Sequence, residues 1–420
     1  MEDLDQHVAS RVDDRVAVVG AGYAGMAAAV TLAQRGVPVT VFEAGQVPGG
    51  RARRILSQGN ELDNGQHILV GAYTELFRLM RTVGVPDNAL LRIPLELRYV
   101  KDFHFRKMSL PAPLGLLFGL LSARGVSFPE RVGAVRFILR LKRQSFRLDP
   151  DIAVDELLER HRQDGRIGHY LWRPLCVSAL NTPSAQASAN AFLAALRDTL
   201  MGADDASDLL LPRVDLSRLF PEPAAAFLLQ KNHQVRLRHP IDDLEPLRRQ
   251  FAAVIVAVGP HQLKALLPDL APEYTYQPIN TCYLQYPENV KLPIPMLGMA
   301  DGLVQWVFDR GALTGEKGLL AAVISAQGDH QQMTQDDLAQ SCHRELAREK
   351  LVAQEPLWAR VIAEKRATVA CTPGVPRPPV ETGIPGVFLA GDYTDPEYPP
   401  TLEAAVRSGI RAAAAASKGN

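Results

Sequence analysis

The chain has 420 residues, of which 47% are hydrophobic and 22% are charged, a balance typical of a globular protein and not of a disordered or fibrous one. Lysine plus arginine equals aspartate plus glutamate, at 46 each, so a general electrostatic attraction to nucleic acid is excluded. The length predicts two or three domains, enough to enclose a cofactor.

The cysteines and the amino-terminal residues indicate the cellular compartment. The four cysteines lie far apart and form no CxxC pair, which predicts neither a disulfide framework nor a metal site. The first ten residues, MEDLDQHVAS, carry acids where an export signal has positive charge, and no run approaches the roughly 18 apolar residues that cross a bilayer. We expect a cytoplasmic protein with flexible ends at residues 1–14 and 416–420.

The first motif lies in residues 15–44, RVAVVGAGYAGMAAAVTLAQRGVPVTVFEA, which predict a strand, a glycine-rich turn, a helix and a second strand. Gly20, Gly22 and Gly25 form G-x-G-x-x-G where the first strand becomes the helix, the arrangement that brings backbone close to a pyrophosphate. Glu43 ends the second strand, where a carboxylate can bind the hydroxyls of an adenosine ribose. This order of elements predicts dinucleotide binding, with FAD or NAD favoured over NADP.

The motif GGRARR follows the second strand at residues 49–54. Gly50 gives a further flexible loop, and Arg51 supplies a guanidinium that can cover a pyrophosphate. Because NAD-binding domains have no need of such a loop, the motif favours FAD.

Near the carboxyl end, GVFLAGDYTD predicts a strand that ends at Gly391 and Asp392, and TLEAAVRSGIRAAAAA predicts a helix that begins at Thr401 and Leu402. An acid at a strand end suits a long cofactor that is gripped at both ends. Free N–H groups at the helix start would stabilise the negative charge of a reduced flavin.

With these motifs the chain resembles the superfamily of FAD-dependent amine oxidases and phytoene desaturases. Four further blocks are similar to the hydroxysqualene dehydroxylases of bacterial hopanoid synthesis: LDNGQHILVGAYTE, RPLCVSALNTP, SDLLLPRVDLSRLFPEPAAAFL and LAGDYTDPEYPPTLEAAVRSGIRAA. The resemblance extends from about Arg15 to Ala415, nearly the whole chain.

The resemblance implies an α/β fold with a discontinuous, Rossmann-like FAD-binding domain of the glutathione-reductase-like type. Residues 15–78, 212–268 and 365–415 would form this domain, and residues 79–211 and 269–364 an α+β substrate domain.

The resemblance also assigns the cofactor contacts. The three fingerprint glycines would hold the pyrophosphate, Glu43 the adenosine ribose and Asp392 the ribityl chain. Arg51 would lie near the pyrophosphate, and Ile241, in QVRLRHPI, would clamp the adenine through backbone groups. Relatives place a β-meander after that strand, whereas here only DDLEPLRRQ precedes the next strand, so we expect the meander to be shortened or lost.

The implied reaction is reductive: hydroxysqualene loses its hydroxyl as water, and reduced FAD delivers a hydride to give squalene. A C30 hydrocarbon requires a long apolar pocket. Two other hypotheses stay open: a polyene desaturase or isomerase, and a non-catalytic FAD- or isoprenoid-binding partner of squalene-synthase-like enzymes. The predicted pocket offers no recognisable aromatic cage, which disfavours an amine oxidase. The sequence identifies no electron donor.

Residues 62–67, LDNGQH, are polar and precede an apolar, helix-like run, which we interpret as the border between cofactor and substrate. His67 is a candidate acid, although we favour a structural or flavin-contact role. Asp63 could be an acid or could hold the loop by Asx-type bonds, the commoner use. Asn181 could line the flavin's substrate face or only form a turn.

Residues 131–147, RVGAVRFILRLKRQSFR, contain six basic residues and no acid, a pattern that predicts a cationic amphipathic helix. Its apolar stripe could meet a membrane or the protein core. Because the implied substrate dissolves only in lipid, we favour peripheral association with the cytoplasmic face of the inner membrane.

Overall fold

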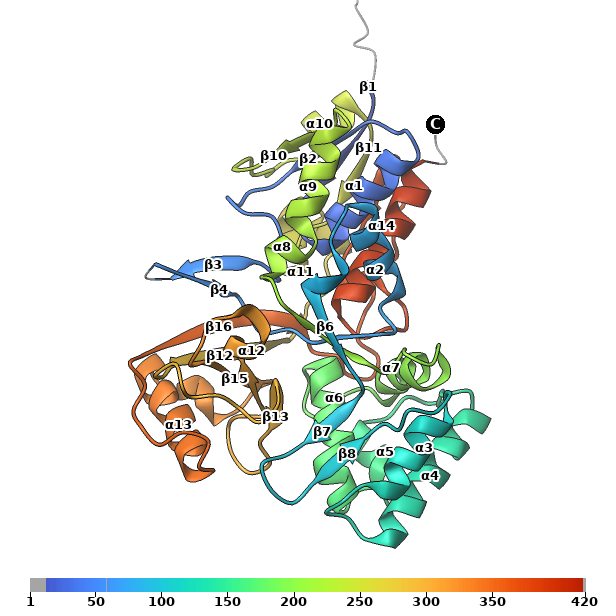
Figure 1. Ribbon diagram of the computed structural model, residues 1–420. Coiled ribbons are helices and arrows are strands. Elements are labelled where there is room, and N and C mark those ends of the chain that lie inside the picture. Colours follow the sequence, from blue (N-terminus) through green and yellow to red (C-terminus); the bar gives the residue numbers. More distant parts are fainter. Residues whose placement is uncertain (1–12, 58, 418–420) are drawn as a thin grey trace, which may run out of the picture.

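The computed structural model describes residues 13–57 and 59–417. Figure 1 shows a parallel sheet flanked by helices at the top, an antiparallel sheet at the lower left and a group of helices at the lower right. Of the ends that we expected to be flexible, residues 1–12 and 418–420 lie outside the described residues. Asp13 already begins the first strand, two residues earlier than the predicted start of the cofactor domain.

Five parallel strands form the upper sheet in the order β10-β2-β1-β11-β17. Their bounds are β1 Asp13–Val19, β2 Val39–Phe42, β10 Gln234–Arg236, β11 Phe251–Val256 and β17 Val387–Leu389. The central strands are buried apolar runs, as in parallel sheets covered on both faces. Chain order reverses between β1 and β11, so their carboxyl ends border a crevice suited to a ligand.

Helices cover both faces of this sheet. One face packs against α1 (Tyr23–Gln34), α9 (Pro221–Gln230) and α14 (Leu402–Ala416). The other face packs against α10 (Glu245–Gln250) and α11 (Pro260–Leu266). Between β10 and β11 the chain forms α10 and no strand, so the segment in which we expected a shortened or lost meander contains only this short helix.

The lower-left sheet is antiparallel, in the order β13-β14-β15-β12-β16. Its strands are β12 Tyr276–Gln285, β13 Met296–Gly298, β14 Trp306–Asp309, β15 Leu319–Ser325 and β16 Trp358–Val369. Residues of β15 alternate between two cores: Leu320 and Ala322 pack with α13 (Gln335–Arg348), whereas Ala321 and Val323 pack with the helical part. The sheet therefore presents one apolar face to the interior of the molecule.

The lower-right part consists of α3 (Leu114–Ser122), α4 (Phe128–Arg143), α5 (Val154–Arg160), α6 (Arg173–Leu180) and α7 (Ala189–Met201), with the hairpin β7 (Glu96–Arg98) and β8 (His104–Arg106). A π-helical turn, Gly168–Trp172, leads into α6. The remaining elements join these parts: β3 Arg54–Ser57, β4 Asn60–Asp63, β5 Leu69–Val70, α2 Thr74–Thr82, β6 Leu90–Ile93, β9 Leu209–Pro212, α8 Leu216–Leu219, α12 Arg310–Thr314, and 3-10 turns at Asp87–Ala89, Pro268–Leu270, Asp329–Gln332 and Asp392–Thr394.

The structure of helix α4 contradicts one interpretation of its sequence. Its apolar residues Ala134, Phe137, Ile138 and Leu141 are buried in the core, so the expectation that this stripe faces a membrane is wrong. The helix also ends at Arg143, before the end of the predicted stretch. Within the described part of the chain, no helix has the length and apolarity needed to cross a bilayer.

Helices α1 and α14 approach closely because Gly409 has no side chain. A Cβ atom there would lie 2.1 Å from the Ala24 carbonyl oxygen. We predict that Gly409→Ala lowers the free energy of unfolding by about 1–3 kcal/mol through overpacking, measured by denaturant titration. Ala415→Ser, at a partly exposed position of the same helix, serves as the control and should change stability by less. Equal stability of Gly409→Ala and the wild type would contradict this account of the helix contact.

Candidate functional site

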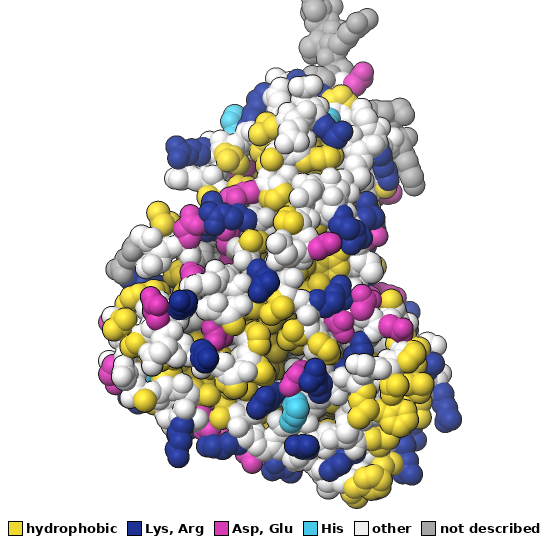
Figure 2. Space-filling model, in the orientation of Figure 1, with side chains coloured by type: hydrophobic (Ala, Val, Ile, Leu, Met, Phe, Trp, Pro, Cys, Tyr) yellow, Lys and Arg dark blue, Asp and Glu magenta, His cyan; other side chains and the backbone are white. Residues whose placement is uncertain are grey.

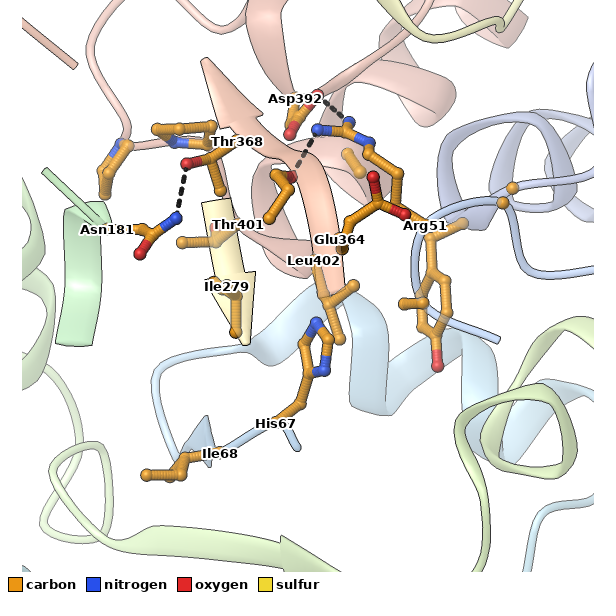
Figure 3. Close-up of a pocket in the computed structure, with 18 of the residues that line it drawn as sticks. Arg51, His67, Ile68, Asn181, Ile279, Glu364, Thr368, Asp392, Thr401 and Leu402 are labelled. Atoms are coloured by element: carbon orange, nitrogen blue, oxygen red, sulfur yellow. Dashed lines mark hydrogen bonds and ion pairs between the residues drawn. The ribbon is translucent and has the colours of Figure 1, made fainter. Parts of the chain in front are cut away.

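One cavity of about 1410 Å³ extends from the carboxyl ends of β1 and β2 into the helical part. Single drug-sized ligands occupy pockets of roughly 300–1,000 Å³, so this cavity has room for a cofactor together with a second ligand. Figure 3 shows residues from distant parts of the chain that line this cavity.

Glycines form the wall of the cavity at the start of α1. A Cβ at Gly20 would lie 2.6 Å from the Ala257 carbonyl oxygen, and one at Gly25 would lie 1.9 Å from the Gly20 carbonyl oxygen. In contrast, a Cβ at Gly22 would meet only the Gly50 Cα, at 3.9 Å. Gly20 and Gly25 therefore permit close packing of the backbone. In contrast, Gly22 and Gly50 face each other at the cavity wall and leave their backbone open to a diphosphate.

Glu43 and Ile241 border the same end of the cavity. The Glu43 carboxylate accepts hydrogen bonds from the backbone N–H of Ala21 and of Gly45, each at 2.7 Å. The backbone N–H of His239 donates to the Glu43 carbonyl oxygen at 2.8 Å, which holds the segment of Ile241 beside the end of β2. These positions fit the adenosine contacts that the sequence predicts.

Arg51 and Asp392 meet although they are far apart in sequence. The Arg51 Nη2 donates to Asp392 Oδ1 at 2.6 Å, and its Nη1 donates to the Ala367 carbonyl oxygen at 2.8 Å (Figure 3). Burial opposes the charge of Arg51, but the nearby carboxylates, Asp392 first and then Glu364, favour it, and the Arg51 pKa is raised. The pair links the GGR loop to the end of β17, where the Gly391 N–H also donates to Ser408 Oγ at 2.8 Å.

The start of α14 borders the cavity through Thr401 and Leu402. Thr401 caps the helix by accepting a hydrogen bond from the Ala404 N–H at 3.2 Å. Together with the start of α1, a second helix N-terminus is thus directed at the same space, and both ends favour negative charge. This arrangement and the glycine wall fit an anionic dinucleotide.

His67 borders the cavity and points from its loop toward Leu402 (Figure 3). Its Nδ1 lies 2.8 Å from the Gly65 carbonyl oxygen. Since a carbonyl only accepts, Nδ1 carries the proton and Nε2 is left as an acceptor. Burial lowers the pKa of His67, and the Arg51 cation lowers it further. The imidazole is therefore neutral at neutral pH, which suits contact with a hydroxyl better than proton donation.

Asp63 is not among the residues that line the cavity. Its buried carboxylate accepts hydrogen bonds from the Leu216 N–H at 2.8 Å and from Arg310 Nη1 at 3.3 Å. Burial raises the Asp63 pKa to about 6 despite the Arg310 cation. The geometry favours the alternative in which Asp63 holds the loop.

Asn181 ends α6 in the left-handed conformation, with φ of 45°. Its Nδ2 donates to Thr368 Oγ1 at 3.1 Å, and its Oδ1 accepts from the Ala326 N–H at 2.8 Å. Asn181 borders the cavity, but these bonds use its amide to join α6 to the antiparallel sheet. The geometry again favours the structural alternative.

Glu364, on β16, is a cavity residue that the sequence analysis missed. Its Oε2 accepts from Asn64 Nδ2 at 2.8 Å, and its Oε1 accepts from the Arg366 N–H at 3.2 Å. Both of these donors are neutral. The Arg51 cation interacts with Glu364 only at longer range, whereas it pairs directly with the Asp392 carboxylate. The signal in the sequence was the polar run EKR within an otherwise mixed strand, but its position beside the cavity depends on sheet pairing.

Beyond His67 the cavity wall becomes apolar. It is lined there by aliphatic and aromatic side chains from the hairpin and the helical part, among them Leu97, Phe105, Leu120, Ile138, Phe192 and Leu196. The cavity thus has a polar half suited to a dinucleotide and an apolar half suited to a hydrocarbon.

Comparison with known proteins decides the family. Residues 23–417 match the family described as flavin containing amine oxidoreductase. The chain belongs to this family. This amine oxidoreductase family member is an FAD-dependent oxidoreductase, and the glycine wall, the Arg51–Asp392 pair and the two helix N-termini are the features that fit FAD.

Individual relatives refine the comparison. A hydroxysqualene dehydroxylase of Sinorhizobium fredii is 29% identical over 421 residues, covering 95% of this chain and 97% of the relative. One from Rhodopseudomonas palustris is 29% identical over 428 residues, with coverage of 95% and 97%. Among solved structures, a putrescine oxidase triple mutant superposes with a TM-score of 0.72 at 17% identity, over 97% of this chain and 99% of that chain. This structural likeness confirms the predicted fold.

We predict that Asp392→Ala reduces the FAD content of the purified protein far more than His67→Ala, because Asp392 orders Arg51 and the end of β17. Absorbance at the flavin band relative to protein gives the ratio. Asp392→Asn is a second variant that keeps the side-chain shape, and it should retain an intermediate amount. Equal FAD content in the Asp392→Ala and His67→Ala proteins would count against the assignment.

Proposed function

We propose that the protein is a hydroxysqualene dehydroxylase that reduces hydroxysqualene to squalene. The observation that carries the proposal is the continuity of one cavity from a dinucleotide cradle to an apolar half. The names of the full-length relatives support the same substrate. The reaction consumes two electrons and two protons, breaks the C–O bond, forms a C–H bond and releases water.

FAD, when bound, supplies the two-electron chemistry. The protein must then hold the hydrocarbon, exclude water and manage one proton at the departing hydroxyl. The apolar half of the cavity holds the chain of the substrate. Neutral His67 accepts a hydrogen bond from the substrate hydroxyl at Nε2, which positions the oxygen at the border of the two halves.

We assign the Glu364 carboxyl as the donor of the proton to the departing hydroxyl. Among the carboxyls that line the cavity, Asp392 is paired with Arg51, and Glu43 accepts two backbone bonds at the adenosine end. Glu364 is left by elimination: in the described part of the chain its carboxyl accepts hydrogen bonds from the Asn64 amide and the Arg366 N–H and forms no direct ion pair, although the Arg51 cation interacts with it at longer range. Asp63 and Asn181, the other predicted catalytic residues, serve structural roles in this proposal.

We further propose that the enzyme associates peripherally with the cytoplasmic face of the inner membrane, because its hydrocarbon substrate resides in lipid. Squalene-synthase-like enzymes would supply the substrate, and a separate electron donor would reduce the FAD. The division into a cofactor domain (residues 15–78, 212–268 and 365–415) and a substrate domain (79–211 and 269–364) is also proposed. The two large sheets support it in part, because β1, β2, β10, β11 and β17 lie in the first set of ranges and β12 to β15 in the second, whereas β16 (Trp358–Val369) crosses the boundary at residue 364.

The product of the purified enzyme tests the function. Under anaerobic conditions with chemically reduced FAD, we expect hydroxysqualene to be converted to squalene, detected by mass spectrometry. Phytoene, offered under oxidising conditions, should be left unchanged. Conversion of phytoene with no squalene formed would overturn the proposal in favour of a polyene desaturase.

Two carboxyl variants test the proton assignment. We predict that Glu364→Gln lowers kcat by roughly 10²-fold or more, the range of a lost general acid, with FAD content unchanged. Asp63→Asn is the matched control and should keep kcat within about threefold, since no proton passes through it. A near-normal kcat for Glu364→Gln would exclude Glu364 as the donor.

A further inference from the structure

Helix α3 separates the apolar half of the cavity from solvent and is apolar on both sides. Leu116 and Leu120 are buried and line the cavity. Leu114 and Phe118, each 48% exposed, lie on the outside. The helix, LGLLFGLLS, contains no charged residue, so even its exposed side is apolar.

The exposed apolar surface continues beyond α3. Met108 and Leu110 precede the helix and are 41% and 40% exposed, and Phe128, at the start of α4, is 66% exposed. Figure 2 shows hydrophobic side chains gathered at the lower right, where Figure 1 draws α3 and α4, with Lys and Arg side chains along the edge. We call the five residues Met108, Leu110, Leu114, Phe118 and Phe128 the α3 patch. Gathered apolar side chains of this kind mark interaction sites.

The exposed charges of α4 beside the α3 patch are basic, and the one acid of that helix, the partly exposed Glu130, is held by Ser127 and the Ile167 N–H. Helix α4 packs against α3 and exposes Arg136, Arg140, Lys142 and Arg143. The acids near the segment that precedes α3 are already engaged. Asp204 accepts from the Ala112 N–H at 2.7 Å, and Asp208 pairs with Lys107 at 2.9 Å. An apolar patch with basic side chains along its edge complements a bilayer surface that contains anionic lipid.

We propose that the α3 patch inserts into the membrane interface, that the exposed basic residues of α4 contact anionic headgroups, and that the hydrocarbon substrate passes from the lipid beneath α3 into the cavity. The substrate path rests on the proposed function; the docking surface itself does not. A second copy of the chain is a poorer occupant, because it would bring the same basic residues together.

The glycines of α3 explain how the helix lies so close to the cavity wall. A Cβ at Gly115 would be 2.5 Å from the Met108 carbonyl oxygen, and one at Gly119 would be 2.6 Å from the Arg106 carbonyl oxygen. The absence of side chains at these two positions therefore lets α3 pack directly against the end of β8 and the segment that follows it.

Flotation of the FAD-loaded protein with vesicles tests the docking surface. We expect binding to vesicles of phosphatidylglycerol and phosphatidylethanolamine that exceeds binding to phosphatidylcholine vesicles. Leu114→Glu combined with Phe118→Glu should weaken binding to the anionic vesicles at least tenfold. Leu229→Glu combined with Leu357→Glu, two exposed apolar residues outside the patch, is the matched control and should bind like the wild type. Wild-type protein that stays unbound, equal binding to both vesicle types, or equal loss in both double variants would overturn the proposal.

Activity measurements separate this proposal from the function. The α3 double variant should convert hydroxysqualene at the wild-type rate in detergent micelles and at least tenfold more slowly from vesicles. No conversion by the wild type in either medium would refute the proposed function while leaving the vesicle-binding result to decide the docking surface. Equal rates from vesicles for the wild type and the α3 variant would refute the path beneath α3.

Discussion

The cofactor half of the molecule depends on a backbone contact that only glycine permits. Where β1 turns into α1, a Cβ on Gly25 would lie 1.9 Å from the Gly20 carbonyl oxygen. The close contact sets α1 on the sheet with its N-terminus facing the crevice between β1 and β11. The GGR loop, the end of β17 and the start of α14 border the same cavity, an arrangement that fits an anionic dinucleotide.

The walls of the single cavity change from polar to apolar along its length. The cradle presents glycine backbone, the Arg51–Asp392 pair and two helix N-termini. The other half presents aliphatic and aromatic walls. His67 stands between them as a neutral imidazole, because burial and the Arg51 cation both lower its pKa. The polar LDNGQH segment borders this transition, and two of its polar residues, Asp63 and Asn64, hold the segment in place through hydrogen bonds.

The sequence motifs predicted the elements around the polar half of the cavity, because each element depends on neighbouring residues. These elements are a turn that needs glycine, a strand that ends in an acid and a helix that begins at a cap. It predicted less where long-range pairing decides. The sequence did not reveal Glu364, whose place beside the cavity follows from the pairing of β16 with β12. The partner of Asp63, Arg310, was likewise not predictable, since 247 residues separate them. Helix α4 has a strong amphipathic pattern, but only tertiary packing determines that its apolar side faces the core.

The central claim is that the two halves of the cavity place FAD and a hydroxylated hydrocarbon in reacting contact. Anaerobic stopped-flow absorbance tests it most directly, with the enzyme-bound flavin reduced beforehand and hydroxysqualene added as the sole oxidant. The account predicts that the oxidised flavin band returns in proportion to the substrate added. A flavin that stays reduced, in protein that retains its FAD and binds the substrate, would contradict the account and indicate a binding protein.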